Sequence, residues 1–278
     1  MRVLEEVACP VRNGQNIVLD ATPQKYFALL ELQKSMEYLS IWIMKTKVAV
    51  ILSGCGVYDG AEIQESVLTL LALEKAGAEV SCLAPDITQR QVIDHSSGDE
   101  LEEEDRNVMV EAARISRGEI LPLDNVKADD FDAFIYVGGF GVAKNLSSYA
   151  FDGANYDVDP AVIDLIQATH TAGKPQGFMC IAPILAARAL GEQHVKLTIG
   201  DDAATVAAIE AKGAHHVDCS FESIVVDKTN RVVTTPAYML AQSITEAERG
   251  INQLVEVVLN MRLQGEIYDD CELDGAKR

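Results

Sequence analysis

The chain has 278 residues, of which 48% are hydrophobic and 24% are charged, the balance of a globular protein with a sizeable core. Its 43 acidic and 23 basic side chains give a net charge of −20. This acidic field repels phosphate backbones, so we expect no nucleic-acid partner. No apolar run is long enough to cross a membrane, and we expect no membrane partner.

The six cysteines lie too far apart for a C-x-x-C metal or redox motif, and no secretory signal precedes them. Reduced thiols in a cytoplasmic protein are therefore the default interpretation, without a metal site. The cysteines are Cys9, Cys55, Cys82, Cys180, Cys219 and Cys271.

Residues 1–43 do not resemble the start of a domain. Glu5, Glu6 and Asp20 count against a mitochondrial transit peptide, which avoids acidic residues. A second possible start at Met44 leads straight into a strand. We predict a leader at 1–43, either an over-extended start or a loosely attached arm, and a single domain at 44–278.

The domain begins with a β-α-β pattern. Residues 48–53 form a β-branched apolar run, typical of a strand buried on both faces of a parallel sheet. Residues 60–77 predict a helix, and residues 78–85 predict a second strand that a right-handed crossover joins to the first. Apolar and polar residues of this helix recur at helical spacing, namely Ile63, Val67, Leu70, Leu71 and Glu74.

Strands and helices then alternate along the chain. We predict a polar insert at 86–129, a strand at 131–141, a helix at 160–174, a strand at 175–180, a helix at 182–191, a strand at 195–200, a helix at 201–214, a hairpin at 223–236 and a closing helix from residue 238. This alternation indicates one α/β domain, a three-layer α/β/α sandwich of flavodoxin-like type. Its central sheet is mainly parallel and ends in the hairpin.

Ligands of such sheets bind at the carboxyl ends of the strands, and there "QGFMCIAP" places Cys180 between a strand and a helix. A nucleophile on such a turn has a strained backbone, and the helix N-terminus lowers the pKa of its thiol. Phe178, two residues earlier, is not small and weakens this interpretation. The alternative is a cysteine that only fills the core.

Two further motifs reach the same edge. In "YVGGFGVAKNLSSYA", Gly138 and Gly139 end a strand and form either an anion-binding nest or a simple turn. In "SGCGVYDGAEIQES", a glycine-rich loop enters a helix that carries Glu62 and Glu65 near one face. Each glutamate is either a favourable partner of the helix dipole or a buried acid that moves a proton beside the thiol.

Four stretches together closely resemble the ElbB proteins of the ThiJ/PfpI superfamily, whose fold is similar to class I glutamine amidotransferase domains. They are "ILSGCGVYDGAEIQE", "VGGFGVAKNLS", "GFMCIAP" and "VVTTPAYMLAQ". The resemblance begins near Met44 and implies Cys180 as the nucleophile, Glu65 as its hydrogen-bonding partner, and Gly139 as an oxyanion-hole residue. The N–H group of Ile181 is expected to help Gly139, and a homodimer is implied as well.

The chain departs from this superfamily at one position. Many members have a histidine directly after the cysteine, whereas Ile181 stands here and cannot act as a base. Protease and amidase chemistry, which needs a base beside the thiol, is therefore disfavoured. None of the five histidines is assigned to the thiol from the sequence.

ElbB proteins are described as isoprenoid-biosynthesis or lycopene-enhancing proteins with glyoxalase activity. The resemblance therefore implies a lyase that needs no cofactor and converts a small 2-oxoaldehyde, such as glyoxal or methylglyoxal, to a 2-hydroxy acid through a hemithioacetal on Cys180. One alternative is a cysteine-based sensor of oxidative stress, or a regulatory protein of isoprenoid metabolism. A third possibility is a binding module whose thiol is unreactive.

Overall fold

The computed structural model describes residues 45–263. The predicted leader at 1–43, Met44, Cys9 and Cys271 lie outside these residues, and the predicted domain boundary stays a prediction. Within the described part, no helix is both long and apolar enough to span a membrane.

A seven-stranded sheet forms the centre of the structure, with the strand order β3-β2-β1-β4-β5-β9-β8. Every neighbouring pair is parallel except β8 and β9, which are antiparallel. The predicted parallel sheet with a C-terminal hairpin is confirmed. The strands are β1 (Lys47–Ile51), β2 (Glu79–Ala84), β3 (Ile120–Pro122), β4 (Ala133–Tyr136), β5 (Gln176–Met179), β8 (Val225–Asp227) and β9 (Val232–Thr235).

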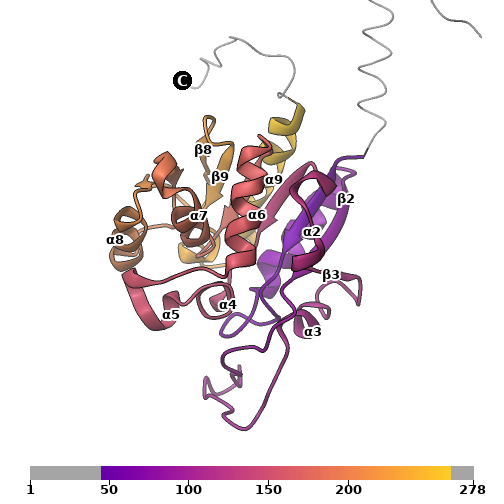
Figure 1. Ribbon diagram of the computed structural model, residues 1–278, viewed down its shortest axis with the longest axis vertical. Helices are drawn as coiled ribbons and strands as arrows, with labels where there is room; N and C mark the ends of the chain where they lie inside the picture. Colours follow the sequence, from indigo (N-terminus) through magenta and orange to yellow (C-terminus); the bar gives the residue numbers. More distant parts are fainter. Residues whose placement is uncertain (1–44, 264–278) are drawn as a thin grey trace, which may run out of the picture. The chain divides into compact units, whose positions relative to one another are not determined.

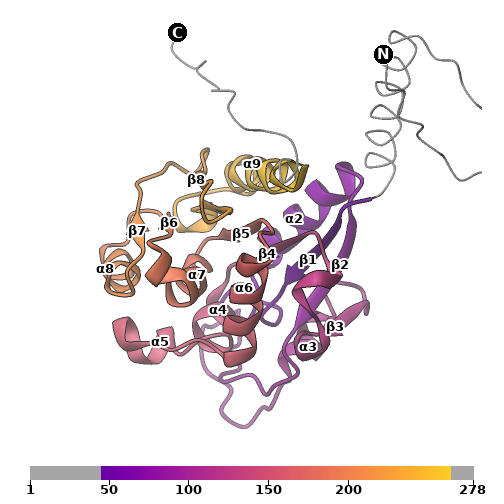
Figure 2. The same cartoon turned by 45° about the horizontal axis from the view of Figure 1, so that its top comes forward.

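Helices cover both faces of the sheet, as the three-layer prediction requires. One face carries α2 (Ile63–Lys75) and α9 (Ile244–Leu263), and the other carries α6 (Pro160–Thr171) and α7 (Pro183–Leu190) (Figures 1 and 2). Successive side chains of a strand point to opposite faces, so Val48 and Val50 pack in the cluster under α2 and α9, while Ile51 packs in the other cluster. Both clusters are apolar, which explains the continuous apolar runs in the sequence.

The closing helix begins later than predicted. Residues 237–239 form a short 3₁₀ turn, η5 (Ala237–Met239), and α9 starts only at Ile244. Ser243 sets this start, because its Oγ accepts a hydrogen bond of 3.3 Å from the N–H of Glu246.

The strand predicted at 195–200 lies outside the main sheet. This strand, β6 (Lys196–Leu197), is short and pairs in parallel with β7 (His215–His216). The helix α8 (Ala203–Ala211) connects the two strands along the chain. The other described elements are α3 (Val108–Ala112), α4 (Phe140–Lys144), α5 (Tyr149–Asp152), η1 (Leu123–Asn125), η2 (Ala128–Asp130), η3 (Gly153–Asn155) and η4 (Gly191–Gln193).

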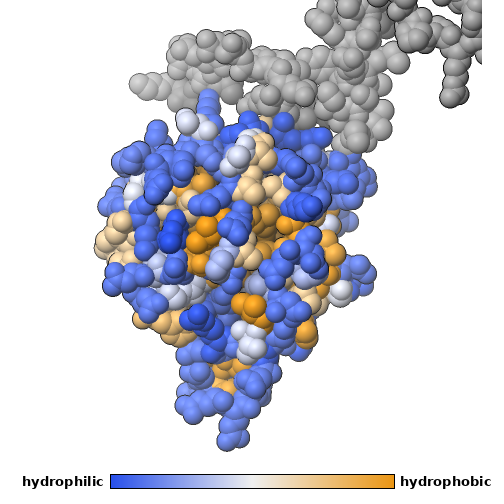
Figure 3. Space-filling model, in the orientation of Figure 1, coloured by the Kyte–Doolittle hydropathy of each residue, from blue (hydrophilic) through white to orange (hydrophobic). Residues whose placement is uncertain are grey.

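Helix α2 turns three of its apolar residues to the surface. Ile63, Val67 and Leu71 are 44%, 51% and 40% exposed, whereas Glu65 and Thr69 on the inner side are fully buried. The spacing of apolar residues therefore predicted the helix correctly but does not mark its buried side. On the opposite layer, the face seen in Figure 1, apolar side chains gather in the middle and hydrophilic ones surround them (Figure 3).

Candidate active site

Cys180 lies on a strained turn between β5 and α7, where the sequence predicts it. Its φ of 58° falls in the left-handed region, which costs a non-glycine residue about 1–3 kcal/mol. The N–H of Cys180 donates a hydrogen bond of 3.0 Å to the carbonyl of Thr235, at the end of the neighbouring strand β9. The side chain is buried, with 8% of its surface exposed. Strain of this kind persists only where the surroundings impose it, and it favours a functional cysteine over a core filler.

Gly138 provides the space for this turn. A Cβ atom on Gly138 would lie 2.4 Å from Cys180 Cβ and 2.5 Å from Glu65 Oε2. The bulky Phe178 does not interfere, because it points to the opposite face of the sheet and stacks on Tyr136 with ring centroids 4.5 Å apart. The small residue that the turn requires therefore comes from the neighbouring strand and not from β5 itself.

Glu65 is a fully buried carboxyl group that receives a backbone N–H on each oxygen. Gly138 N–H donates to Oε2 at 3.1 Å and Tyr238 N–H donates to Oε1 at 3.2 Å. Burial, and to a smaller degree the charge of Glu62, raise the pKa of Glu65 to about 8, although the two N–H groups and Cys180 act in the opposite direction. Glu65 is thus more than a favourable partner of the helix dipole.

The thiol of Cys180 and the carboxyl of Glu65 are coupled. Burial and the charge of Glu65 raise the pKa of Cys180 well above its usual range, while hydrogen bonds from the N–H groups of Gly139 and Ile181 lower it. The expected lowering by the helix N-terminus is therefore outweighed. Since each negative charge disfavours the other, the two groups titrate as a pair, and the thiolate forms most readily when Glu65 takes its proton.

Gly139 adopts a conformation that only glycine accepts easily. Its φ is 100°, and a Cβ there would lie 2.4 Å from both the nitrogen of Glu62 and the carbonyl oxygen of Gly60. Together with Ile181, it presents a backbone N–H to the sulfur of Cys180. The structure thus brings Cys180, Glu65 and Gly139 together, and their catalytic roles stay predictions.

The end of β9 contributes residues to the site that the sequence analysis did not assign. Ala237 has a φ of 43°, a second strained position beside the first, and it turns the chain so that Tyr238 N–H reaches Glu65. The Tyr238 hydroxyl also donates to Gln64 Oε1. The stretch "VVTTPAYMLAQ" is one of the four that carry the family resemblance. No pattern within it, however, distinguishes a residue that donates a backbone hydrogen bond from an ordinary loop residue.

Three of the histidines make their hydrogen bonds elsewhere. His95 Nε2 lies 3.2 Å from the N–H of Tyr58, His170 Nε2 lies 3.2 Å from Asn230 Oδ1, and His194 Nδ1 lies 3.2 Å from the carbonyl of Gly213. Among residues 45–263, no group of three or more His, Cys, Asp or Glu side chains could hold a metal ion.

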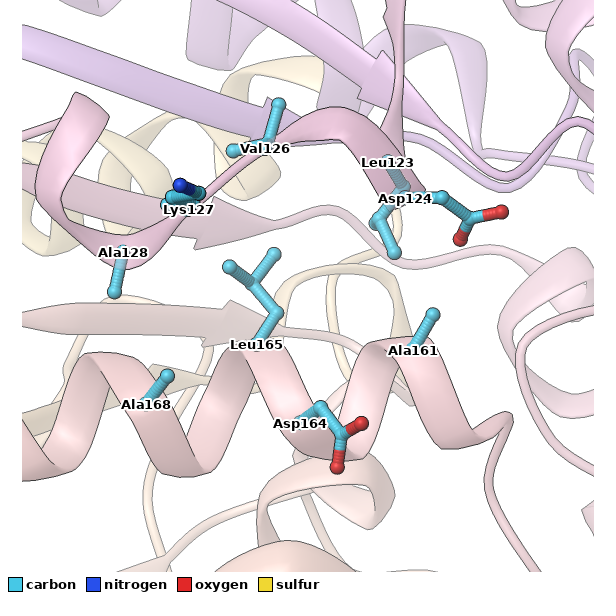
Figure 4. A pocket seen from close by; sticks show the side chains of 9 residues that line it. All are labelled: Leu123, Asp124, Val126, Lys127, Ala128, Ala161, Asp164, Leu165 and Ala168. Carbon is cyan, nitrogen blue, oxygen red and sulfur yellow. The ribbon is translucent and has the colours of Figure 1, made fainter.

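A hollow of about 410 Å³ lies between α6 and the segment that contains η1 and η2. In this hollow Leu165 points from α6 towards the segment that carries Val126 (Figure 4). Its lining does not include Cys180, Glu65 or Gly139, and it is formed by Leu123, Asp124, Val126, Lys127, Ala128, Ala161, Asp164, Leu165 and Ala168.

Comparisons with known proteins give a consistent result. No protein-family model matches the chain. The human glutamine amidotransferase-like class 1 domain-containing protein 3, mitochondrial, is 44% identical over 82% of this chain and 88% of its own length. The rat ES1 protein homolog, mitochondrial, is 43% identical over 78% of this chain and 84% of its own length. The crystal structure of an isoprenoid biosynthesis protein with an amidotransferase-like domain from Ehrlichia chaffeensis has a TM-score of 0.71 and 36% identity, and covers 77% of this chain and 99% of its own.

Proposed function

Because the chain belongs to the family of glutamine amidotransferase-like class 1 domain proteins that includes the ES1 homologues, we propose its function from the chemistry of the buried cysteine that this fold presents. We propose a glyoxalase that needs no cofactor and converts a small 2-oxoaldehyde to a 2-hydroxy acid. The observation that carries this proposal is the pairing of Cys180 with Glu65, a buried carboxyl group whose pKa is raised to about 8. Such a group both accepts and donates a proton near neutral pH.

The first step forms the hemithioacetal. The sulfur of Cys180 attacks the aldehyde carbon, C1, while the thiol proton passes to the Glu65 carboxylate. One electron pair of the C1–O double bond moves to the oxygen, which becomes negatively charged. The N–H groups of Gly139 and Ile181, which face the sulfur in the structure, would stabilise this negative oxygen. Glu65 then gives its proton to the oxygen and is a carboxylate again.

The second step moves hydrogen within the substrate. The Glu65 carboxylate removes the hydrogen on C1 as a proton, a C1–C2 double bond forms, and the C2 oxygen becomes the anion of an enediol. Glu65 returns the proton to C2, and a proton moves from the C1 oxygen to the C2 oxygen. C1 is thereby oxidised to a thioester and C2 is reduced to an alcohol, so that no external oxidant is needed. Water cleaves the thioester and releases the 2-hydroxy acid and the Cys180 thiol.

The residue after the nucleophile supports carbonyl chemistry over amide hydrolysis. Ile181 is half-buried and carries no base, and the hydrogen bonds of His95, His170 and His194 lead away from the thiol. The Cys-His pair of many superfamily members is therefore absent at this position, and the proposed hydrogen shift uses the one carboxyl group of Glu65.

Turnover of methylglyoxal to lactate tests the proposal. We expect Cys180→Ser and Glu65→Gln each to lower kcat by at least 100-fold, and Cys219→Ser, a half-buried cysteine elsewhere, to leave it unchanged. In deuterated water, the proton that Glu65 carries exchanges with solvent before Glu65 returns it to C2, so we expect deuterium on C2 of lactate. A wild-type protein without turnover, or a fully active Cys180→Ser variant, contradicts the proposal.

A sensor of oxidation, or a regulatory protein of isoprenoid metabolism, is the second candidate. It is favoured by the same pair, since a protonated Glu65 can donate a hydrogen bond to a sulfinate on Cys180. The raised pKa of the thiol counts against it, because the thiolate is the form that oxidants attack. Selective sulfinic acid on Cys180 after mild peroxide, without turnover of aldehydes, would support the sensor.

We also propose that the protein forms a homodimer through helix α2. Its exposed side chains between residues 63 and 71 are Ile63, Gln64, Val67 and Leu71, none of which is charged. Two copies that each carry a net charge of −20 repel one another, and an uncharged apolar surface is where they approach at the lowest electrostatic cost. Light scattering coupled to size exclusion tests this assembly.

The cellular location of the protein does not follow from the chemistry of its site. The names of the human and rat relatives place those proteins in mitochondria. For this chain we propose the cytoplasm, because six cysteines without C-x-x-C spacing are typical of reduced thiols in a cytosolic protein. Fluorescence microscopy of the full chain with a C-terminal label tests this, and overlap with a mitochondrial stain contradicts it.

A further inference from the structure

Glu62 occupies the N-cap position of α2, three residues before Glu65. Its Oε2 accepts a hydrogen bond of 2.6 Å from the backbone N–H of Glu65. Its own backbone N–H donates to the carbonyl of Gly138 at 3.0 Å. Glu62 therefore contacts both the helix that carries the carboxyl group and the glycine turn opposite.

Together with the hydrogen bond from Gly138 N–H to Glu65 Oε2, these contacts form a closed ring. Three hydrogen bonds of 3.0, 3.1 and 2.6 Å link Glu62 to Gly138, Gly138 to Glu65, and Glu65 back to Glu62, in that order. The next residue, Gly139, presents its N–H to Cys180. A shift at Glu62 is therefore transmitted to the carboxyl group and to the oxyanion donor at once.

We propose that Glu62 is a positioning residue that holds Glu65 and the Gly138–Gly139 turn in register with Cys180 and, through its charge, sets the protonation of the pair. The proposal rests on the proposed function only for its effect on turnover. Its effect on the thiol is independent of any substrate.

Among residues 45–263, neither Glu62 nor Glu65 forms a salt bridge that would screen its charge. The groups that face Glu62 are Glu65 on its own helix, Tyr238 on η5, and beyond Glu65 the thiol of Cys180. Burial raises the pKa of the Glu62 carboxyl, and the N–H groups of Glu65 and Gln64 lower it. The negative charge of Glu62 in turn raises the pKa of Glu65 and that of Tyr238.

Two substitutions separate the two roles. Glu62→Gln keeps an oxygen that can accept the Glu65 N–H but removes the charge, and Glu62→Ala removes both. Glu74→Gln, an exposed acid in the last turn of the same helix, is the matched control for loss of one charge. Thermal unfolding shows whether each variant is folded, and Glu62→Asp, which retains a capping carboxyl, is the conservative rescue.

The main readout is the pH profile of Cys180 alkylation by iodoacetamide, followed by mass spectrometry. The Cys180–Glu65 pair titrates in two steps, and the profile has a midpoint for each. We expect the midpoint at the lower pH to fall by about half to one pH unit in Glu62→Gln, because one negative charge near the pair is gone. Glu74→Gln should not move it. In Glu62→Ala we expect the same shift and, in addition, a loss of methylglyoxal turnover of more than about tenfold in kcat with little change in KM, since the reacting groups lose their alignment.

Each result decides the proposal. An alkylation midpoint in Glu62→Gln that equals that of the wild type overturns the electrostatic role, and full turnover in a folded Glu62→Ala overturns the positioning role. If the midpoint shifts as expected but even the wild type converts no aldehyde, the proposed function fails while the role of Glu62 in the pair stands.

Discussion

The backbone N–H of Gly138 donates a hydrogen bond of 3.1 Å to Glu65 Oε2, and the α-carbon of the same glycine lies against Cys180. This residue joins the end of β4, the helix α2 and the turn after β5 at one point. The thiol and the carboxyl group can therefore meet only because Gly138, between them, has no side chain. A side chain at this position should affect both groups together.

We predict that Gly138→Ala abolishes turnover. A Cβ would lie 2.4 Å from Cys180 Cβ and 2.5 Å from Glu65 Oε2, distances that the backbone cannot relieve without moving the site. We expect kcat/KM for methylglyoxal to fall by at least 100-fold and the unfolding free energy to fall by about 1–3 kcal/mol. Gly118→Ala is the control for turnover, because no atom lies within 4 Å of a Cβ there, and its φ of 94° means that it should lose stability but keep wild-type kinetics. Wild-type kinetics in Gly138→Ala would mean that the pair is not held as described.

Glu65 predicts a pH dependence of stability. Its pKa is about 8 in the folded protein against an ordinary value of 4.5, so the folded state binds the proton more tightly than the unfolded chain. The contribution of Glu65 to the unfolding free energy is therefore complete below pH 4.5 and is lost as the pH rises towards 8, by up to about 1.4 kcal/mol per pH unit. Glu65→Gln, which cannot ionise, should lack this loss.

Urea unfolding of the wild type and of Glu65→Gln at pH 5.5, 7 and 8.5 measures this effect. The contributions of the other titratable groups largely cancel in the difference between the two proteins. We expect Glu65→Gln to gain stability relative to the wild type as the pH rises. A difference that does not change with pH would show that burial does not perturb Glu65.

The sequence was sufficient for the layers of the fold but not for every element. Continuous β-branched runs such as 48–53 predict strands buried on both faces, and the structure confirms them. The helix α2 shows the limit, because Ile63, Val67 and Leu71 are exposed, whereas its buried side carries polar residues such as Glu65 and Thr69 beside two leucines. Periodicity describes an amphipathic helix, but only tertiary contacts decide which of its sides is buried.

The residues that gather at the candidate site could be predicted from the sequence, but part of the backbone that holds them could not. The motifs at the ends of strands predict that Cys180, the two glutamates and the Gly138–Gly139 turn lie at one edge of the sheet. The choice of Glu65 and Gly139 among these residues was implied by the resemblance to the ElbB proteins. The N–H of Tyr238 and the positive φ of Ala237 were not predicted, because nothing in the stretch after β9 distinguishes these two residues from an ordinary loop. The direction of the Cys180 pKa was also hidden, because it depends on burial that only the structure shows.

The proposed reaction predicts a rate that rises with pH. The active form of the pair lacks one proton, and burial sets the pKa of Glu65, the lower member, to about 8. We expect kcat/KM for methylglyoxal to increase roughly tenfold per pH unit below this value and to level off above it. Initial rates of lactate formation between pH 6 and 9.5 measure the profile. A rate that is constant or falls between pH 7 and 8 would contradict proton transfer through Glu65.

The proposed homodimer predicts that one charge on α2 separates the subunits. Val67, at the centre of the three exposed apolar residues of α2, is 51% exposed, so that Val67→Glu adds a charge without disturbing the core of a monomer. In a dimer this charge would be buried against its own copy, and unpaired buried charges are strongly destabilising. We expect light scattering to show a monomer for Val67→Glu and a dimer for Val110→Glu, a control on α3 where the valine is 59% exposed. A dimer in both variants would place the interface elsewhere, and a monomeric wild type would overturn the assembly itself.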